Sequence, residues 1–427
     1  MTTKAEAPKI DAIEEIYESL KGIKETIERK YPERNWVVEP PFTYLDIVHK
    51  GLQEKKPLLW YFFALPQELF RAFDIVSYSP EYVCGIWASM GSRGISKVQK
   101  YFDIAAEHVT DGLCGVNKFP VGLMLSGDSR IPDMAIFGAS DPCDAAKATY
   151  SNLNFCYNVP SFYIDAPYLS DERGYKYVAG QLKEMIKFLE EHAGHKLDQD
   201  RLKEVISYSN EAYATLRKID DLRKNVPSPI ASREVYAAGT AMMGLAGTPQ
   251  IARWLKDRYE VAKEKAKSGE GALKEEKHRL LWVANHIEMD LTIFDWLEEK
   301  YGAVTVASLL GRFPFEPIDV SGGESTILKG MAKRVLEYPI TRQGRGPVDV
   351  FVNEIVRVAT DFKADGVILA GNIGCKYYWA SAQLTKDMVY DAIGIPTIPI
   401  ELSPWDPRVA SPEGIRTQFD QFFELMM

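Results

Sequence analysis

The chain has 427 residues, of which 46% are hydrophobic, and a formal net charge of −9 at pH 7. This length is sufficient for two or three domains with their own buried cores, and the acidic balance argues against a nucleic-acid-binding protein, which normally carries a basic face. No apolar run reaches the roughly 18–20 residues that cross a bilayer, and the N-terminal residues lack the apolar stretch of a secretory signal. We therefore expect a cytoplasmic protein with neither nucleic acid nor membrane as a partner.

The first 57 residues predict a helical extension. A charged pattern typical of a solvated helix covers about residues 10–30. Pro32, Pro40 and Pro41 are expected to interrupt it, because proline has no N–H group to donate within a helix. A second helix is expected over Thr43–Gln53.

Two stretches, residues 58–170 and 277–427, predict α/β domains, in which buried apolar strands alternate with helices. The expected strands are, in chain order, Leu58–Phe63, Phe73–Tyr78, Met134–Phe137, Ser161–Ile164, Leu280–Ala284, Val304–Leu309, Gly366–Ala370 and Ile398–Leu402, with a long amphipathic helix over about Ser96–Val109. Residues 171–276 have apolar residues at helical spacing, which predicts a helical segment. The expected fold class is α/β, with two doubly wound, mostly parallel-sheet domains joined by that helical segment.

Five cysteines are spread over the chain without any Cys-x-x-Cys pair: Cys84, Cys114, Cys143, Cys156 and Cys375. In a reducing compartment they are not expected to form disulfides, and this spacing does not predict a structural zinc finger or ribbon. Any metal ligands among them must come together in the fold from distant positions. The alternative for each cysteine is an ordinary buried thiol.

Two of the cysteines follow a buried strand and a tight turn. Cys143 comes after the strand Met134–Phe137 and directly after Asp141-Pro142, residue types that favour a helix start. Cys375 comes after the strand Val367–Ala370 and a glycine-containing turn. A helix start places a thiolate near the positive end of the helix dipole, which predicts a lowered thiol pKa and favours metal ligation. Ligands gather at the carboxyl ends of parallel strands, and both cysteines fall at such ends.

Cys114 lies in a third turn, close to Gly112 and Gly115. Three thiolates are one fewer than the four that normally hold a [4Fe–4S] cluster. One iron would then remain open to a substrate oxygen or to water, as catalytic zinc keeps an open position. Residue types and spacing alone leave this cluster and a set of unrelated buried thiols as alternatives.

Short motifs from about Leu58 onward occur in an order and spacing that resemble one known family. The motifs are Leu65–Leu69, Ser79–Glu81, Leu113-Cys114, Pro142–Asp144, Val159-Pro160, Tyr163–Asp165, Asp365–Val367, Cys375-Lys376 and Gly394–Pro396. The chain resembles the benzoyl-CoA reductase / 2-hydroxyacyl-CoA dehydratase family. The resemblance implies a [4Fe–4S] cluster between two α/β domains, held by Cys114, Cys143 and Cys375. It implies no ligand role for Cys84 or Cys156, which are expected to be buried thiols.

The resemblance also implies partners. A homologous second subunit forms a heterodimer with the cluster subunit, and an ATP-hydrolysing iron–sulfur activator injects one low-potential electron. This chain has no Walker motif, so ATP chemistry is expected in a partner. The substrate implied is a CoA thioester, which is converted to a ketyl-type radical anion. In dehydratases this radical expels the 2-hydroxyl group as water, whereas in the reductase an aromatic ring is reduced.

The choice between these activities depends on the stretch before the Leu65 motif. Some dehydratase subunits have a small hydroxyl residue there, but this chain has Trp60–Ala64 without Ser or Thr. An aromatic wall suits a flat ring and excludes water from a radical, although the same residues also suit an ordinary strand core. We therefore expect a benzoyl-CoA reductase-like subunit, with a 2-hydroxyacyl-CoA dehydratase subunit as the alternative. A non-catalytic electron-relay or scaffold subunit is the alternative from another class, and no catalytic residue is assigned.

Two further segments have weaker patterns. Thr341–Gly346 combines arginines with glycines, which predicts either a CoA-phosphate contact or a mobile basic loop. Trp405–Arg408 departs from the more acidic pattern of the family at this position, so no function is assigned to it.

Overall fold

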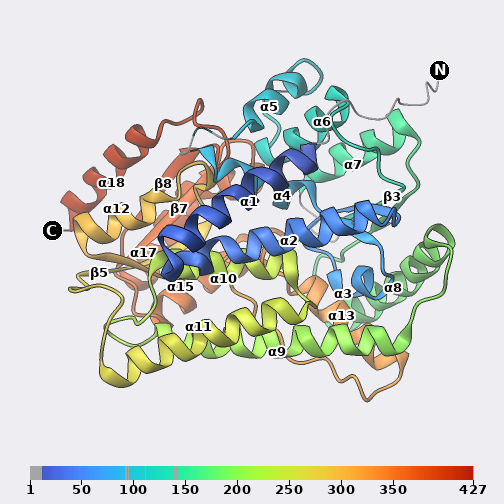
Figure 1. The fold of residues 1–427 in the computed structure, drawn as a ribbon. Helices are drawn as coiled ribbons and strands as arrows, with labels where there is room; N and C mark the ends of the chain where they lie inside the picture. Colours follow the sequence, from blue (N-terminus) through green and yellow to red (C-terminus); the bar gives the residue numbers. More distant parts are fainter. Residues whose placement is uncertain (1–11, 92–93, 95, 111, 139–142, 427) are drawn as a thin grey trace.

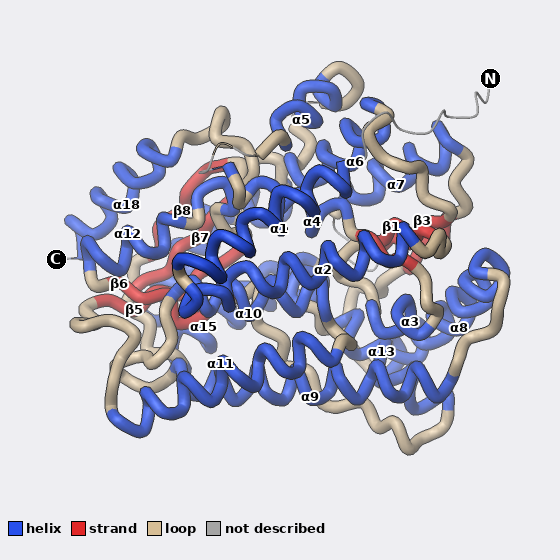
Figure 2. Tube along the Cα trace, in the orientation of Figure 1, coloured by secondary structure: helices blue, strands red, loops and turns tan. Residues whose placement is uncertain are grey.

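The computed structural model describes residues 12–91, 94, 96–110, 112–138 and 143–426. Two groups of strands stand apart in the molecule, each surrounded by helices (Figures 1 and 2). Each group is a four-stranded, entirely parallel sheet. The α/β class with two parallel sheets, predicted from the sequence, is therefore confirmed.

The two sheets repeat one strand order. The strands are β1 (Leu58–Tyr61), β2 (Val76–Tyr78), β3 (Met134–Gly138), β4 (Ser161–Ile164), β5 (His278–Ala284), β6 (Ala303–Ser308), β7 (Gly366–Asn372) and β8 (Thr397–Leu402). The first sheet has the order β2-β1-β3-β4 and the second β6-β5-β7-β8. β3 and β7 therefore hold equivalent positions in the two sheets.

Helices connect and cover the strands of both sheets. In the first half of the chain, which we define as residues 58–170, they are α3 (Gln67–Ala72), α4 (Pro80–Ala88), α5 (Val98–Ala106), α6 (Gly115–Ser126) and α7 (Asp144–Tyr157). In the second half, which we define as residues 277–427, they are η3 (Glu288–Asp290), α12 (Thr292–Tyr301), α13 (Glu324–Leu336), α14 (Pro339–Gly344), α15 (Val348–Asp361), α16 (Lys376–Ala380), α17 (Ala382–Ile393) and α18 (Pro412–Met426). The helix expected over Ser96–Val109 is shorter than predicted, and α6 was not predicted at all. None of the helices in the described part of the chain has both the length and the apolar character needed to cross a bilayer.

The helical segment between the sheets consists of α8 (Glu172–Ala193), α9 (Gln199–Arg223), α10 (Ser232–Leu245) and α11 (Pro249–Ser268). Most of its buried hydrophobic residues belong to the same hydrophobic core as those of the first sheet. The second sheet is covered on both faces. Leu281 and Val283 pack in one cluster, and their neighbours Leu280 and Trp282 pack in another, because successive residues of a strand point to opposite faces.

The N-terminal extension contains α1 (Ala12–Lys30), η1 (Pro32–Arg34) and α2 (Asn35–Gln53). The expectation that Pro40 and Pro41 interrupt the helix is wrong, because α2 runs through both. Pro40 leaves the carbonyl of Trp36, four residues earlier, without its helical donor. The indole Nε1 of Trp254 donates to that carbonyl at 3.2 Å. A contact from α11 thus replaces the missing hydrogen bond.

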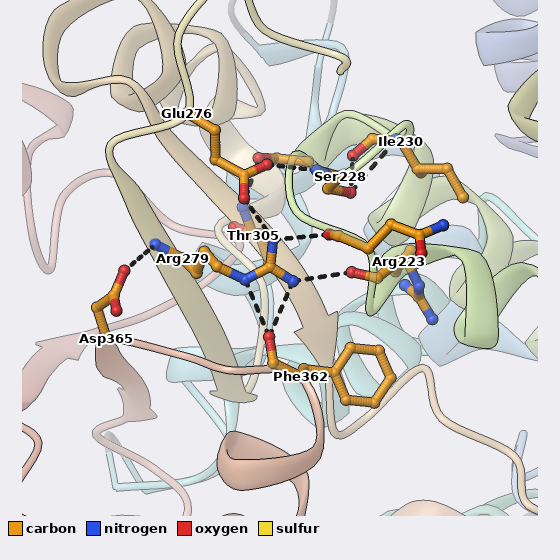
Figure 3. A network of polar contacts seen from close by, with 10 residues as sticks. Arg223, Ser228, Ile230, Glu276, Arg279, Thr305, Phe362 and Asp365 are labelled. Atoms are coloured by element: carbon orange, nitrogen blue, oxygen red, sulfur yellow. Dashed lines mark hydrogen bonds and ion pairs between the residues drawn. The ribbon is translucent and has the colours of Figure 1, made fainter. Parts of the chain in front are cut away.

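Arg279 in β5 joins the second sheet to the helical segment (Figure 3). Its guanidinium group is buried and donates to the carbonyl oxygens of Phe362 at 2.8 and 3.0 Å, Arg223 at 2.9 Å and Asn225 at 3.0 Å. It also pairs with Glu276, whose side chain is equally buried. These contacts fix the end of α9 and the end of α15 against β5.

Candidate functional site

A cavity of about 330 Å³ lies between the two halves of the chain. Residues that follow β1, β3, β5 and β7 line it, among them Phe62, Asn285 and Gly374. This is the place where parallel sheets generally bind ligands, since the carboxyl ends of the strands leave room for loop side chains. Cys114 and Cys143 from the first half and Cys375 from the second line the same cavity. The structure thus brings together the three cysteines that the sequence singled out.

Each of these cysteines is the residue immediately before a helix. Cys114 precedes α6, Cys143 precedes α7 and Cys375 precedes α16. The expected helix start at Asp141-Pro142 lies outside the described residues. Backbone N–H groups of the first turns favour the three thiolates and oppose part of the effect of burial on their pKa.

The lowered thiol pKa predicted from the helix starts is wrong. Burial raises the pKa of Cys114 to about 12 and raises the pKa values of Cys143 and Cys375 as well, and the neighbouring cysteines add to the effect for Cys114 and Cys143. Desolvation of three thiolates in one place therefore outweighs the helix starts. Charge from a bound cation or cluster is what would compensate for this cost.

The two halves meet in direct contact at the cysteines. The side-chain amide Nδ2 of Asn372, at the end of β7, donates to Sγ of Cys114 at 2.8 Å. A β-carbon on Gly374 would lie 2.7 Å from the backbone N and Cα of Cys114, so only glycine fits there. At the rim, exposed Lys376 and Asp144 form an ion pair between α16 and α7.

The donor set of the cavity suits a cluster better than a single metal ion. In the part of the chain that the structure describes, no three His, Cys, Asp or Glu side chains are grouped closely enough to hold one metal ion. A [4Fe–4S] cluster needs more widely spaced thiolates, because each one binds a different iron atom. Three cysteines around one cavity, with an amide hydrogen bond to one sulfur, fit that requirement.

The other two cysteines lie away from the cavity wall. Cys84, in α4, is fully buried and does not line the cavity, which agrees with the buried thiol expected there. Cys156, near the end of α7, is exposed, so the expectation of a buried thiol is wrong for this residue. Helical periodicity places position 156 on the same side as the buried Ala145, but the end of α7 is exposed from Asn154 to Cys156.

Two buried carboxyl groups line the cavity, and the sequence interpretation gave neither a role. Glu81, in α4, accepts hydrogen bonds from the hydroxyl groups of Ser79 and Tyr150, each at 3.1 Å. Glu288 follows β5. Among the described residues, Oε1 of Glu81 and Oε2 of Glu288 have no hydrogen-bond partner. Burial raises the pKa of Glu81 to about 7 and that of Glu288 to about 8, so both groups can hold a proton near neutral pH.

The aromatic stretch before the Leu65 motif divides between two environments. Trp60 and Tyr61 belong to β1 and are buried in the core. Phe62 and Phe63, just beyond the strand, line the cavity. The strand-core alternative is therefore right for the first pair, whereas the second pair forms an aromatic wall.

Comparison with known proteins identifies the family. Residues 62–426 match the family model described as 2-hydroxyglutaryl-CoA dehydratase, D-component. The chain belongs to this dehydratase family. It is 25% identical over 389 residues to one of the benzoyl-CoA reductase subunits of Thauera aromatica, covering 84% of this chain and 86% of that one. It is 23% identical over 243 residues to the (R)-2-hydroxyisocaproyl-CoA dehydratase alpha subunit of Clostridioides difficile, covering 54% and 58%.

The resemblance found from the short motifs is thereby confirmed, and with it the class of enzyme. Members of the 2-hydroxyglutaryl-CoA dehydratase D-component family and the two relatives are named as components or subunits of acyl-CoA dehydratases or an acyl-CoA reductase. The chain is a subunit of an enzyme of this class. The motif Ser79–Glu81 was part of the resemblance, and the structure shows that its serine and glutamate hydrogen-bond to each other beside the cavity.

The two arginines of the basic segment Thr341–Gly346 are not free to bind a CoA phosphate. Its first residues belong to α14. Arg342 pairs with Glu354, and Arg345 donates to the carbonyl oxygens of Pro167 and Leu336. Both guanidinium groups are thus engaged in internal contacts, and the alternative of a mobile basic loop is wrong as well. In the segment 405–408, by contrast, Trp405 lines the cavity.

Proposed function

We propose that this chain is the [4Fe–4S] subunit of a radical-type acyl-CoA reductase similar to benzoyl-CoA reductase, with Cys114, Cys143 and Cys375 as its protein ligands. One observation carries the proposal: these three cysteines, from both halves of the chain, line a single cavity at the carboxyl ends of two sheets. A bound cluster would supply single electrons at low potential. Three thiolates would leave one iron without a protein ligand.

The chain's own residues suit a reaction that consumes protons. Glu81 is held by Ser79 and Tyr150 with one oxygen unpartnered among the described residues, so it can carry a proton at the cavity wall and release it there. Glu288 is a second carboxyl group on the same cavity, from the other half. Phe62 and Phe63 supply an apolar surface that excludes water from a reactive intermediate.

The proposal includes partners that the chain does not contain. We infer a homologous second subunit in a heterodimer, because both relatives are named as one subunit of an enzyme. An ATP-hydrolysing iron–sulfur activator is inferred from the family resemblance and from the absence of a Walker motif in this sequence. The substrate is a CoA thioester, and the expected location is the cytoplasm.

The alternative function is dehydration of a 2-hydroxyacyl-CoA, which the family description and the Clostridioides difficile relative support. Ala64 and the two phenylalanines favour ring reduction, since no hydroxyl side chain stands directly before the Leu65 motif. A subunit that only relays electrons has no need of a cavity with two protonatable carboxyl groups. That feature weighs against a relay or scaffold role.

Two experiments test the proposal. Iron and sulfide are counted in protein purified and reconstituted without oxygen, and about four of each per chain are expected. Far fewer would contradict the cluster. The purified complex with its activator is then offered benzoyl-CoA and a 2-hydroxyacyl-CoA side by side. Conversion of benzoyl-CoA alone supports the reductase, and conversion of the hydroxyacyl thioester alone supports the dehydratase.

A further inference from the structure

The cavity reaches beyond the cysteines to the N-terminal helix pair α1–α2. The residues of this pair that line it are all apolar: Leu20, Ile23, Ile27, Val37, Val38, Pro40 and Pro41. The family match begins only at residue 62. This apolar wall therefore lies in a part of the chain outside the family match, whereas the cysteines and Glu81 lie within it.

One face of α1 forms the wall. Leu20, Ile23 and Ile27 recur at helical spacing, so they lie on one side of the helix. Glu25 and Thr26, on the other side, are exposed. The helix pair runs across the front of the molecule, with α1 in front of α4 in the view of Figure 1. The apolar side of α1 thus lines the same cavity as the cysteines of both halves.

The position of α1 is fixed by polar contacts at its start. The backbone N–H of Ala12 donates to the carbonyl of Asp128 at 2.8 Å. Glu14 pairs with His49 of α2 at 2.7 Å, and the ring of His49 stacks on Tyr17 with centroids 4.1 Å apart. A wall held in this way has a defined distance from the opposite side of the cavity.

The cavity follows α4 between its two ends. Glu81, Tyr82, Gly85, Ile86 and Ser89 all line it. At 1.5 Å per residue, the stretch from Glu81 to Ser89 spans roughly 12 Å. This length accommodates an aromatic ring or a short aliphatic chain beyond the carboxyl group of Glu81.

The charges of the cavity exclude an anionic acyl group. Its cationic lining residues in the described chain already have carboxylate partners: Arg233 pairs with Asp295 at 2.7 Å, and Lys376 pairs with Asp144. Glu81 and Glu288 contribute further carboxyl groups. A carboxylate at the end of an acyl group would be desolvated here without a free cation to compensate.

We propose that the helix pair α1–α2 determines acyl specificity in this subunit. Its apolar wall receives the distal part of an uncharged, apolar acyl group of a CoA thioester and rejects acyl groups that end in a carboxylate. Ile23, in the middle of the α1 face, sets the depth of the acyl pocket. This inference rests on the proposed function, because it assumes that the cavity holds the acyl group of the substrate.

Three variants test it in the complete complex with its second subunit and activator. Ile23→Phe shortens the pocket and Ile23→Ala deepens it, whereas Thr26→Phe adds comparable bulk on the solvent side of the same helix. We expect Ile23→Phe to lower kcat/KM for the preferred acyl-CoA at least tenfold. Ile23→Ala should shift the ratio of kcat/KM between a longer and a shorter apolar acyl-CoA by about tenfold or more, the usual effect of one methylene group in a pocket.

Controls separate this effect from misfolding and from cluster loss. Thr26→Phe should stay within about twofold of the unmodified enzyme for every substrate. Iron content should be unchanged in all variants, and the Ile→Ala variants should still unfold cooperatively at a modestly lower temperature. If Ile23→Phe fails to fold, Ile23→Ala and Ile27→Ala still test the wall, since both remove side-chain volume. Glutaryl-CoA should bind at least tenfold more weakly than an apolar acyl-CoA of similar length in isothermal titration.

The outcomes distinguish the inference from the proposed function. An unchanged ratio of kcat/KM for longer and shorter substrates in both Ile23 variants overturns the inference and leaves the function intact. Equal binding of glutaryl-CoA overturns it as well. A complex that retains iron but converts no acyl-CoA contradicts the proposed function, and the specificity inference then fails with it.

Discussion

The two halves of the chain share a strand order but differ in what they bring to the cavity. In each half the third strand, β3 or β7, leads to a cysteine that precedes a helix. The first half adds a second cysteine, Cys114, and two phenylalanines, whereas the second half adds Asn285 and Glu288. The common topology therefore sets where side chains gather, and the loop residues decide which chemistry each side supplies.

Removal of a cysteine from either half is expected to have the largest effect. Cys143→Ser and Cys375→Ser should each reduce iron from about four to fewer than about one atom per chain, because serine is a poor substitute for a thiolate on iron. The measurement is iron and sulfide content after anaerobic reconstitution. If one half alone sufficed to hold the cluster, one of these variants would remain loaded.

The remaining cysteines provide matched controls. Cys156→Ser changes an exposed thiol and should leave iron content and stability unaltered. Cys84→Ser changes a buried thiol and should keep the cluster at a modest cost in stability. Loss of iron in Cys84→Ser, together with retention in Cys114→Ser, would show that the first half contributes a different ligand from the one proposed.

The second half depends on a buried guanidinium group that joins its sheet to the helical segment. Arg279→Met removes the donor to the carbonyl groups of Arg223, Asn225 and Phe362 and leaves the carboxylate of Glu276 buried without this partner. We expect a loss of about 3–5 kcal/mol in the free energy of unfolding. Chemical denaturation measures it.

A surface ion pair serves as the control for this loss. Lys263→Met removes an exposed pair with Glu260 in α11 and should cost less than about 0.5 kcal/mol. A similarly small effect for Arg279→Met would mean that the second sheet does not rely on its contact with α9 and α15.

The buried carboxyl group of the first half should make stability depend on pH. Burial raises the pKa of Glu81 from 4.5 to about 7 in the folded protein, so the folded state binds this proton more tightly than the unfolded state. The contribution of Glu81 to stability therefore falls as pH rises from about 4.5 to about 7 and is level above that range. Glu81→Gln removes this dependence, and its free energy of unfolding relative to the unmodified protein should rise by roughly 3 kcal/mol across the window.

Denaturation curves at a series of pH values measure this effect. Glu211→Gln, on the exposed side of α9, is the control and should differ from the unmodified protein by less than about 0.5 kcal/mol at every pH. A Glu81→Gln variant whose relative stability is constant between pH 4.5 and 7 would show that Glu81 is ionised throughout this range in the folded protein.

The smallest effect is expected at the rim, where the halves touch through an exposed ion pair. The side chains of Lys376 and Asp144 are 79% and 55% exposed. Lys376→Ala should therefore change the free energy of unfolding by less than about 1 kcal/mol and leave iron content unchanged. Loss of iron in this variant would mean that the rim pair, rather than the cysteines and the Asn372–Cys114 contact, holds the halves together.

The features that were predicted from sequence are those that depend on local patterns. Short apolar runs located the strands, and the position of Cys143 and Cys375 after two of them placed both at the same kind of edge. The hydrogen bond from Asn372 to Cys114 was not predicted, because it joins residues 258 positions apart and neither has a local signal for it. The same holds for Glu288, whose burial results from packing between the two halves.

Predictions from local sequence rules also failed where residues distant in the sequence changed the local environment. Pro40 lies within a helix because Trp254 supplies the missing hydrogen bond. The helix starts did not lower the thiol pKa values, since the burial of neighbouring thiols together has the larger effect. Periodicity along α7 places Cys156 on the same side as the buried Ala145, so its exposure near the end of the helix could not be predicted from that pattern.

The contact between Asn372 and Cys114 has a consequence for the biogenesis of the protein. Cys114 leaves the ribosome 258 residues before its partner at position 372, which corresponds to roughly 10–50 seconds at typical rates of synthesis. During that interval the first half can fold its own sheet while its two cavity cysteines still lack the covering strand β7. Assembly of the complete three-cysteine site is therefore a late step that follows translation of the second sheet, and the cluster proposed for this site would be inserted only into the finished chain.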